Sequence, residues 1–173
     1  TPHGVIVHTG DLKLDHMGGV PTEEEFKEFG KFKNEKVLLL MADSTNCQRP
    51  GYSIPEPTVH KTVEELIKNS NGRVIIATFS SLLERIIKIL EFADTHGKKV
   101  VIDGRSMKTN IELAQKAGLF KFKKGTVINI EEMDSYPADR IVMLVTGAQG
   151  DAFAVLMRAA MKKHKHLKIR EGD

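Results

Sequence analysis

The sequence contains no tryptophan and only one cysteine, Cys47, among its 173 residues. A single thiol cannot form a disulfide within the chain, which fits a reducing compartment, and we expect a cytoplasmic protein. The longest uninterrupted apolar run covers residues 37–42, far fewer than a membrane-spanning helix needs. No basic segment followed by an apolar one opens the chain, so no signal peptide is expected. These absences exclude a disulfide scaffold and predict that no membrane is a partner.

Neither sign of charge is in large excess, because 26 lysines and arginines face 23 acidic residues and give a net charge of +3. This balance does not by itself indicate a nucleic-acid-binding protein. Basic residues gather in residues 162–170, which favours a solvated helix end or edge strand, with attraction to phosphate as the alternative. The apolar content of 40% and charged content of 28% are typical of a folded globular chain.

Short apolar runs alternate with amphipathic segments along most of the chain. The runs with strand character cover residues 5–9, 37–42, 73–78, 99–102, 126–130 and 140–145. The segments with helical spacing cover residues 58–69, 81–96, 106–117 and 151–163. Ser80 or Ser81 is expected to cap the second helix and Ser106 the third, while Gly97 and Gly118 end them. This alternation predicts an α/β fold, a parallel-stranded sheet with helices on both faces.

The sequence changes character near residues 49–57, which contain three prolines and form the expected connector. Residues 58–173 carry the alternating strands and helices of an α/β domain. Residues 1–48 contain only two strand-like runs and are too short for a domain of their own. We therefore expect the chain to begin inside a domain whose earlier part lies outside it.

Polar residues follow the predicted parallel strands at residues 78–81, 103–106 and 146–150. Ligands of such sheets collect at the carboxyl ends of the strands, and hydroxyls, glycines and a guanidinium suit an anion or phosphate. The turn at residues 146–150 could point backbone N–H groups at a phosphate, or could simply be a tight strand-to-helix connection. It is neither a P-loop nor a complete dinucleotide fingerprint.

Two aspartates follow the first two strand-like runs. Asp11 comes after residues 5–9, and Asp43 directly follows residues 37–42. A carboxylate at a strand end is well placed to bind a metal, but an aspartate followed by small polar residues also makes a good turn. From spacing alone, both interpretations stay open.

Several motifs occur in an order that resembles the ribonuclease J family, metallo-β-lactamase-fold nucleases that carry an inserted β-CASP domain. They are TGDLKLD at residues 9–15, DSTN at 43–46, RPG at 49–51, ATFSS at 77–81, GRSM at 104–107 and TGAQG at 146–150. The resemblance covers nearly the whole chain. It implies a short C-terminal piece of a metallo-β-lactamase fold in residues 1–48, followed by a β-CASP domain that is incomplete at its C-terminus.

The resemblance also implies an activity and a set of site residues. The full-length parent would be a zinc-dependent RNA exo- or endonuclease that hydrolyses phosphodiester bonds and forms a homo-oligomer. Asp11 matches the family's ligand of a zinc pair, and Asp43 matches the acidic residue thought to orient a histidine near the scissile phosphate. The RNA-binding residues would be Ser80, Ser81, Arg105, Ser106, Gly147, Gln149 and Gly150.

Departures from the family pattern qualify this expectation. No His-x-His-x-Asp-His motif occurs, and Ala148 and Asp151–Ala152 stand where the family usually has serine and an acidic–proline pair. Residues 82–84 also lack the usual Asn-x-His. We therefore expect residues 1–173 alone to be metal-free and inactive. The alternatives are a non-catalytic RNA-binding module of β-CASP type and a nucleotide-binding α/β domain that uses residues 146–150.

Overall fold

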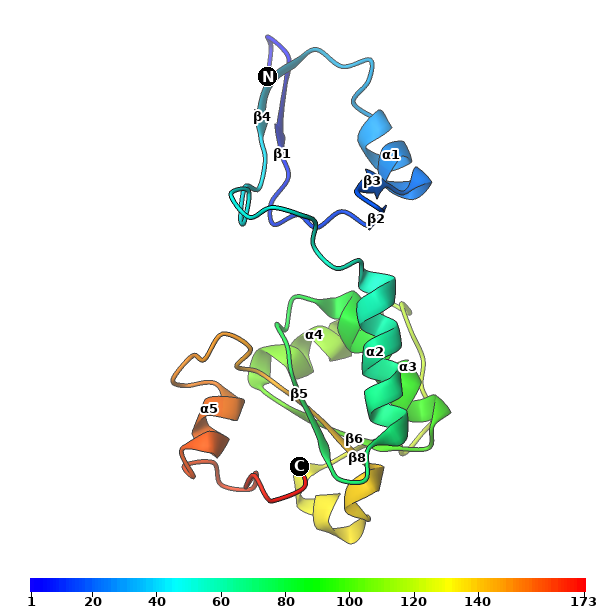
Figure 1. Ribbon diagram of the computed structural model, residues 1–173, viewed down its shortest axis with the longest axis vertical. Coiled ribbons are helices and arrows are strands. Elements are labelled where there is room, and N and C mark those ends of the chain that lie inside the picture. The colour runs from blue at the N-terminus through cyan, green and yellow to red at the C-terminus, as the bar shows by residue number, and fades with distance from the viewer. The chain divides into compact units, whose positions relative to one another are not determined.

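The computed structural model describes residues 1–173, which divide into two compact units, Thr1–Val59 and His60–Asp173 (Figure 1). We call them the N-terminal unit and the C-terminal unit and describe each by itself. The division falls inside helix α2, Glu56–Asn69, which includes the last two residues of the proline-rich stretch. Pro57 lies in its first turn, where a missing N–H breaks no helical hydrogen bond.

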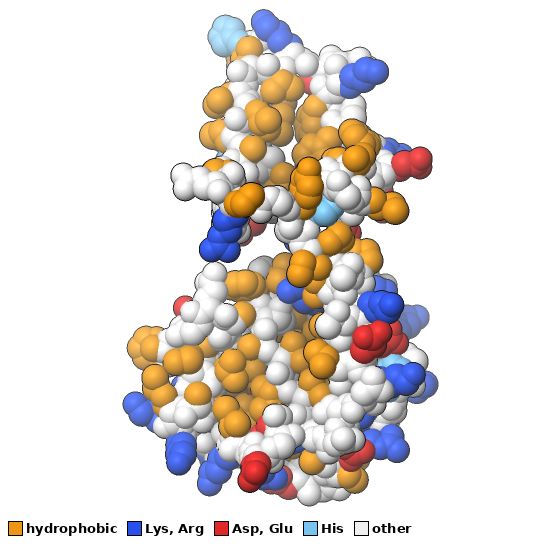
Figure 2. Space-filling model, viewed as in Figure 1, with side chains coloured by type: hydrophobic (Ala, Val, Ile, Leu, Met, Phe, Trp, Pro, Cys, Tyr) orange, Lys and Arg blue, Asp and Glu red, His pale blue; other side chains and the backbone are white.

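The N-terminal unit contains two small sheets and one helix. Its elements are β1 (Val5–His8), β2 (His16–Met17), β3 (Val20–Pro21), α1 (Glu23–Gly30) and β4 (Val37–Met41). β1 and β4 pair in parallel, and β2 and β3 form an antiparallel hairpin. All five side chains of β4 are exposed, by 41–59%, and Figure 2 shows apolar side chains over the surface of this unit. β4 thus has the composition of a strand buried on both faces, but within the N-terminal unit its side chains are only about half covered.

The C-terminal unit is built on a four-stranded parallel sheet. Its strands are β5 (Val74–Ala77), β6 (Lys99–Asp103), β7 (Val127–Ile128) and β8 (Ile141–Val145). The order across the sheet is β5-β8-β6-β7, and all neighbours run parallel. Every residue of β8 is buried, as expected for an inner strand covered on both faces.

Helices cover both faces of this sheet, which confirms the predicted α/β architecture (Figure 1). One face packs against α2, α3 (Leu83–Thr95) and α4 (Arg105–Lys116). The other packs against α5 (Val155–Ala160) and the 3₁₀ helix η1 (Ile130–Ser135). A second 3₁₀ turn, η2 (Ala138–Arg140), leads into β8. Strand side chains alternate between the two cores, so that Val100 faces the first and Val101 the second.

Three expected helix starts are wrong. α3 begins after Leu82, so neither Ser80 nor Ser81 caps it, and no side chain bonds to its first turn. α4 begins one residue before Ser106, which therefore lies inside the helix instead of capping it. α5 is shorter than residues 151–163, because its preceding residues close a loop and Lys162, with φ of 59°, ends it. No helix of the chain combines the length and the apolar character that crossing a bilayer requires.

Candidate functional site

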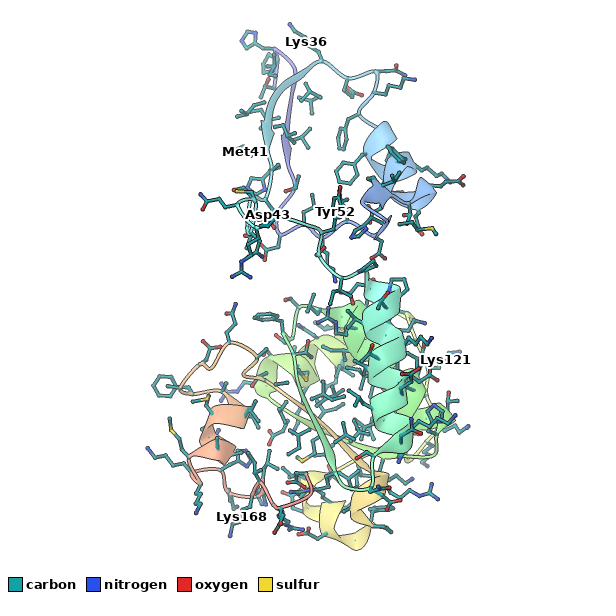
Figure 3. All side chains as sticks on the ribbon, viewed as in Figure 1. Lys36, Met41, Asp43, Tyr52, Lys121 and Lys168 are labelled. Atoms are coloured by element: carbon teal, nitrogen blue, oxygen red, sulfur yellow. The ribbon has the colours of Figure 1, made fainter.

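Asp11 and Asp43 lie in neighbouring loops at one edge of the β1–β4 sheet. The two strands run parallel with His8 opposite Met41, so both loops leave at the carboxyl ends. The Leu12 N–H donates to Asp43 Oδ2 at 3.2 Å, and the Asp43 N–H donates to Thr9 Oγ1 at 3.0 Å. Figure 3 shows Asp43 just beyond Met41. The fold therefore brings the two predicted site carboxylates to the same end of the sheet.

The two carboxylates differ in how firmly the backbone holds them. Asp43 accepts the Thr45 N–H at 2.8 Å on Oδ1 and the Leu12 N–H on Oδ2. Hydrogen bonds from the Thr45 N–H, the Thr45 hydroxyl and the Leu12 N–H lower the pKa of Asp43, and so hold it ionised. This bonding also confirms the turn that the sequence suggested at residue 43. The Asp11 carboxylate is exposed and accepts no hydrogen bond from the protein, so its oxygens are free to bind a ligand.

A cavity of about 740 Å³ adjoins Asp43 within the N-terminal unit. Its wall consists of Leu12, Lys13, Asp43, Ser44, Thr45, Asn46, Cys47, Arg49, Pro50, Gly51, Tyr52 and Ser53. Lys13 and Arg49 line the same cavity as Asp43, and the lysine pairs with Glu56 at 2.6 Å. A cavity that holds one acid and two cations can accept a phosphate group while presenting a carboxylate to it.

A second group of predicted residues meets at one edge of the C-terminal sheet, which we call the strand-end edge. It comprises residues 78–81, 103–106 and 146–150, which follow β5, β6 and β8. Ala77 and Asp103 both lie opposite Val145, so the three segments leave side by side. The Thr78 N–H extends the ladder by donating to the Val145 carbonyl at 3.1 Å. The parallel sheet thus gathers these residues as expected.

Glycines allow the segments of the strand-end edge to approach closely. A Cβ on Gly104, with φ of +129°, would lie 2.7 Å from Thr146 Cγ2. A Cβ on Gly147, with φ of +119°, would lie 2.9 Å from the Cβ of Ala154. The Gly150 N–H donates to the Gly147 carbonyl at 3.1 Å and closes a tight turn. Packing alone therefore requires glycine at residues 104 and 147, and phosphate binding by this turn stays a prediction.

Donors at the strand-end edge remain open to solvent. Arg105, Ser81, Ser106 and Gln149 are exposed, while Ser80 is half-buried and its carbonyl accepts Asn110 Nδ2 at 2.6 Å. α4 starts here without a side-chain cap and without an acidic residue in its first turn. Its first N–H groups and the positive end of its dipole therefore face the same edge as the Arg105 guanidinium, an arrangement that suits an anion.

A buried histidine at this edge was not recognised from the sequence. His164 is 8% exposed, and its Nε2 lies 3.1 Å from Asp103 Oδ2. Its Nδ1 accepts the backbone N–H of Leu167 at 2.9 Å, which places the ring proton on Nε2. Burial lowers the pKa of His164 although Asp103 opposes this, so the ring is neutral. The bond between His164 and Asp103 therefore anchors the chain after α5 to the end of β6.

The residues of this chain do not by themselves fit a zinc pair. No group of three or more histidine, cysteine, aspartate or glutamate side chains lies close enough together to hold a metal ion. Structural and catalytic zinc sites need at least three protein ligands. Asp11 would supply one of them.

The C-terminal unit is thus a parallel α/β domain, the class of fold in which ligands commonly bind at the carboxyl ends of the strands. The family described as "Ribonuclease J, beta-CASP domain" matches residues 71–173. The chain belongs to this ribonuclease J family, as its motifs predicted.

Several curated relatives match the whole chain, and three of them illustrate the similarity. Ribonuclease J of Corynebacterium glutamicum is 36% identical, ribonuclease J2 of Bacillus subtilis 35%, and ribonuclease J of Thermus thermophilus 38%. In each case the match covers 100% of this chain, and it covers 24%, 31% and 30% of the respective relative. The chain therefore spans about a quarter to a third of the length of the curated relatives it matches.

Proposed function

We propose that residues 1–173 are part of a longer, cytoplasmic, metal-dependent ribonuclease that hydrolyses phosphodiester bonds in RNA, and that they do not cleave RNA alone. Membership of the ribonuclease J family supports the reaction class. The observation that carries the proposal is the meeting of Asp11 and Asp43 at one edge, joined by the Leu12 N–H. As in the family, we expect the full-length protein to form a homo-oligomer, which its mass in solution would test.

Asp11 is the proposed metal ligand. Its carboxylate lies at a strand end, is exposed, and has no competing hydrogen bond within the protein. The other ligands of a zinc pair would come from outside residues 1–173, because no sufficient cluster exists within them. This chain alone should consequently bind no stoichiometric zinc.

Asp43 is the proposed catalytic carboxylate. The backbone N–H groups of Leu12 and Thr45 fix its orientation and keep it ionised. An ionised carboxylate held in this way can orient a histidine that protonates a leaving oxygen. The cations of Lys13 and Arg49 in the adjoining cavity would attract the phosphate to the same place.

The strand-end edge is the proposed RNA-binding surface of the C-terminal unit. Arg105 and the uncapped start of α4 provide charge and donors for phosphates, and the exposed amide of Gln149 offers a further contact. Because phosphate contacts release counterions, RNA affinity at this edge should fall steeply with salt concentration.

The decisive experiment compares three carboxylate-to-amide variants in the full-length protein. Asp11→Asn should lower both bound zinc and RNA cleavage, and Asp43→Asn should lower cleavage while zinc is retained. Glu24→Gln removes the same charge from an exposed position on α1 and should change neither. Normal turnover by the Asp11 variant would refute its role, and zinc loss by the Asp43 variant would refute the division between the two carboxylates.

A non-catalytic RNA-binding module is the second candidate, favoured by the exposed donors of the strand-end edge, which suit phosphate contacts without any metal. It predicts salt-dependent RNA binding by the full-length protein without zinc and without cleavage. Zinc analysis and an RNA cleavage assay on the unmodified full-length protein separate the two candidates.

A further inference from the structure

Phe153 is the most solvent-exposed large apolar side chain of the protein. It is 93% exposed and lies in the loop between β8 and α5, three residues after Gly150. Phenylalanine is usually buried, because exposing its ring to water forfeits a large hydrophobic free energy. A ring held open to solvent on a loop is therefore available to a ligand that presents a flat, apolar face.

The chain that follows Phe153 is basic, with its cations at residues 158–170 and none in residues 146–157. Residues 146–170 contain six lysines and arginines and one acidic residue, Asp151. Arg158 is exposed on α5, five residues after the phenylalanine, and Lys162 is exposed directly after that helix. An aromatic ring next to closely spaced cations is the usual composition of a surface that binds single-stranded nucleic acid.

The loop that carries Phe153 starts at the strand-end edge. β8 ends beside β5, and the chain leaving β5 presents a second aromatic side chain, Phe79, which is 42% exposed. Thr146 closes the base of the loop, because its carbonyl accepts the Leu156 N–H at 3.1 Å. The exposed ring is thus attached to a fixed base next to the proposed phosphate contacts.

We propose that Phe153 is a stacking platform for an unpaired base of single-stranded RNA, with Arg158 and Lys162 contacting the neighbouring phosphates. This proposal rests on the proposed RNA-binding role of the strand-end edge and adds a base-contacting residue to it. The other exposed residues of the loop are glycine, alanine, glutamine and aspartate.

The absence of tryptophan from the chain allows a direct test. Phe153→Trp introduces the one tryptophan of residues 1–173, and its fluorescence, excited selectively over that of the two tyrosines, should be quenched by stacking on a base. The ligands are a single-stranded oligoadenylate of about ten nucleotides, close to the site size of a single-strand-binding domain, an abasic strand of the same length, and inorganic polyphosphate. We expect quenching by the oligoadenylate and none by the other two, because only the first carries bases.

Leu119→Trp is the matched control. Leu119 is 64% exposed and follows α4, which starts at the strand-end edge and runs about 18 Å away from it. Lys116 and Lys121 lie close to it in sequence. This control therefore also tests whether nearby lysines, away from the strand-end edge, are enough for RNA to quench a tryptophan. Its fluorescence should not change with the oligoadenylate.

Affinity measurements complete the test. Phe153→Ala should weaken oligoadenylate binding roughly 5- to 140-fold, the equivalent of about 1–3 kcal/mol for one stacked base. Phe153→Leu keeps an apolar side chain but removes the flat ring, so it should lose most of the same affinity. Phe153→Trp should bind at least as tightly as the unmodified protein, and polyphosphate binding should be equal in all variants.

The outcomes separate this inference from the proposed function. If RNA binds to Phe153→Ala as tightly as to the unmodified protein and does not quench the fluorescence of Phe153→Trp, the proposal that Phe153 stacks on a base is wrong, while RNA binding at the edge stands. If no variant binds RNA, the proposed function of the edge fails as well. Fluorescence of Phe153→Trp that responds to protein concentration but not to RNA would mark the ring as a contact between copies of the chain and would overturn the proposal.

Discussion

The bond between His164 and Asp103 leads to a prediction that two substitutions can dissect. The histidine uses Nε2 to donate to Asp103 and Nδ1 to accept the Leu167 N–H. Asparagine at residue 164 can still accept the backbone N–H but is too short to reach Asp103. Glutamine has the reach to donate to Asp103 but does not keep the backbone acceptor in place. Each variant therefore removes one of the two bonds.

The expected cost follows from the burial of the two partners. A hydrogen bond to a charged group stabilises a protein by about 1.5–3 kcal/mol. The Asp103 side chain is 21% exposed, so water replaces part of the lost bond and the lower end of this range applies. His164→Asn should thus lower the free energy of unfolding by about 1.5–2 kcal/mol, or Tm by about 3–8 °C.

The pH dependence gives the prediction its specific signature. Burial, assisted by the nearby charges of Arg158 and His166, lowers the pKa of His164 against the opposing effect of Asp103. The unfolded chain then takes up a proton at higher pH than the folded chain. The stability that the neutral ring contributes is complete above about pH 6.5 and is lost as the pH falls from there through the lowered pKa of the folded protein.

The assay is urea unfolding followed by far-ultraviolet circular dichroism at about pH 7.5 and about pH 5.5, on either side of the ordinary histidine pKa. The unmodified protein should lose more stability between these values than His164→Asn, whose residue 164 does not titrate. Equal pH dependence of the two proteins would refute the reasoning, as would an unchanged midpoint for His164→Asn at the higher pH. His164→Gln should keep part of the stability, since it retains the donor to Asp103.

Three further substitutions test the C-terminal unit. Gly104→Ala should lower the free energy of unfolding by about 1–3 kcal/mol, because it adds a clash with Thr146 to an unfavourable φ. Gly118→Ala, at a φ of 74° with nothing within 4 Å of the added Cβ, should lower it less. Equal urea midpoints for the two variants would contradict this. Arg73→Met should cost about 3 kcal/mol, because it removes the guanidinium partner of the buried Asp173 carboxylate and leaves only the Arg170 N–H bonded to it, and a cost below about 1 kcal/mol would refute a structural role for this ion pair. Burial raises the pKa of Asp173, but the hydrogen bonds from Arg73 and the Arg170 N–H and the charges of both arginines together lower it below its ordinary value, so the stability that the pair contributes should fade below about pH 4 in the unmodified protein only. Arg105→Ala should weaken RNA binding and reduce its salt slope by about 1, and an unchanged slope would remove Arg105 from the phosphate contacts.

The strands and main helices of the C-terminal unit could be predicted because their signals are local. β8 is apolar at every position, and α3 repeats its apolar residues at helical spacing. Parallel pairing followed from the alternation of the two element types. Once the strands are parallel, their carboxyl ends must share an edge, so the placement of residues 80, 105 and 149 at that edge also followed.

The helix starts at α3 and α4 could not be predicted, because packing decided them. A serine before an apolar segment is a good cap only if the backbone there is free to adopt the capping geometry. At α4 the backbone instead approaches Thr146, and this contact selects Gly104 as the N-cap residue that precedes the helix. α1 is different, since Thr22 and Glu25 form a recognisable N-terminal signal that strand spacing alone does not reveal.

Side-chain pattern along the chain was enough to define the α/β class, the family and the two aspartates at strand ends, since each is encoded within a few consecutive residues. Packing in three dimensions was needed to pair Asp103 with His164, to orient Asp43 with the Leu12 N–H, and to leave Phe153 in solvent. The partners in the first two pairs lie 61 and 31 residues apart in the chain. Contacts of that separation depend on how whole strands align, and no local pattern records the alignment.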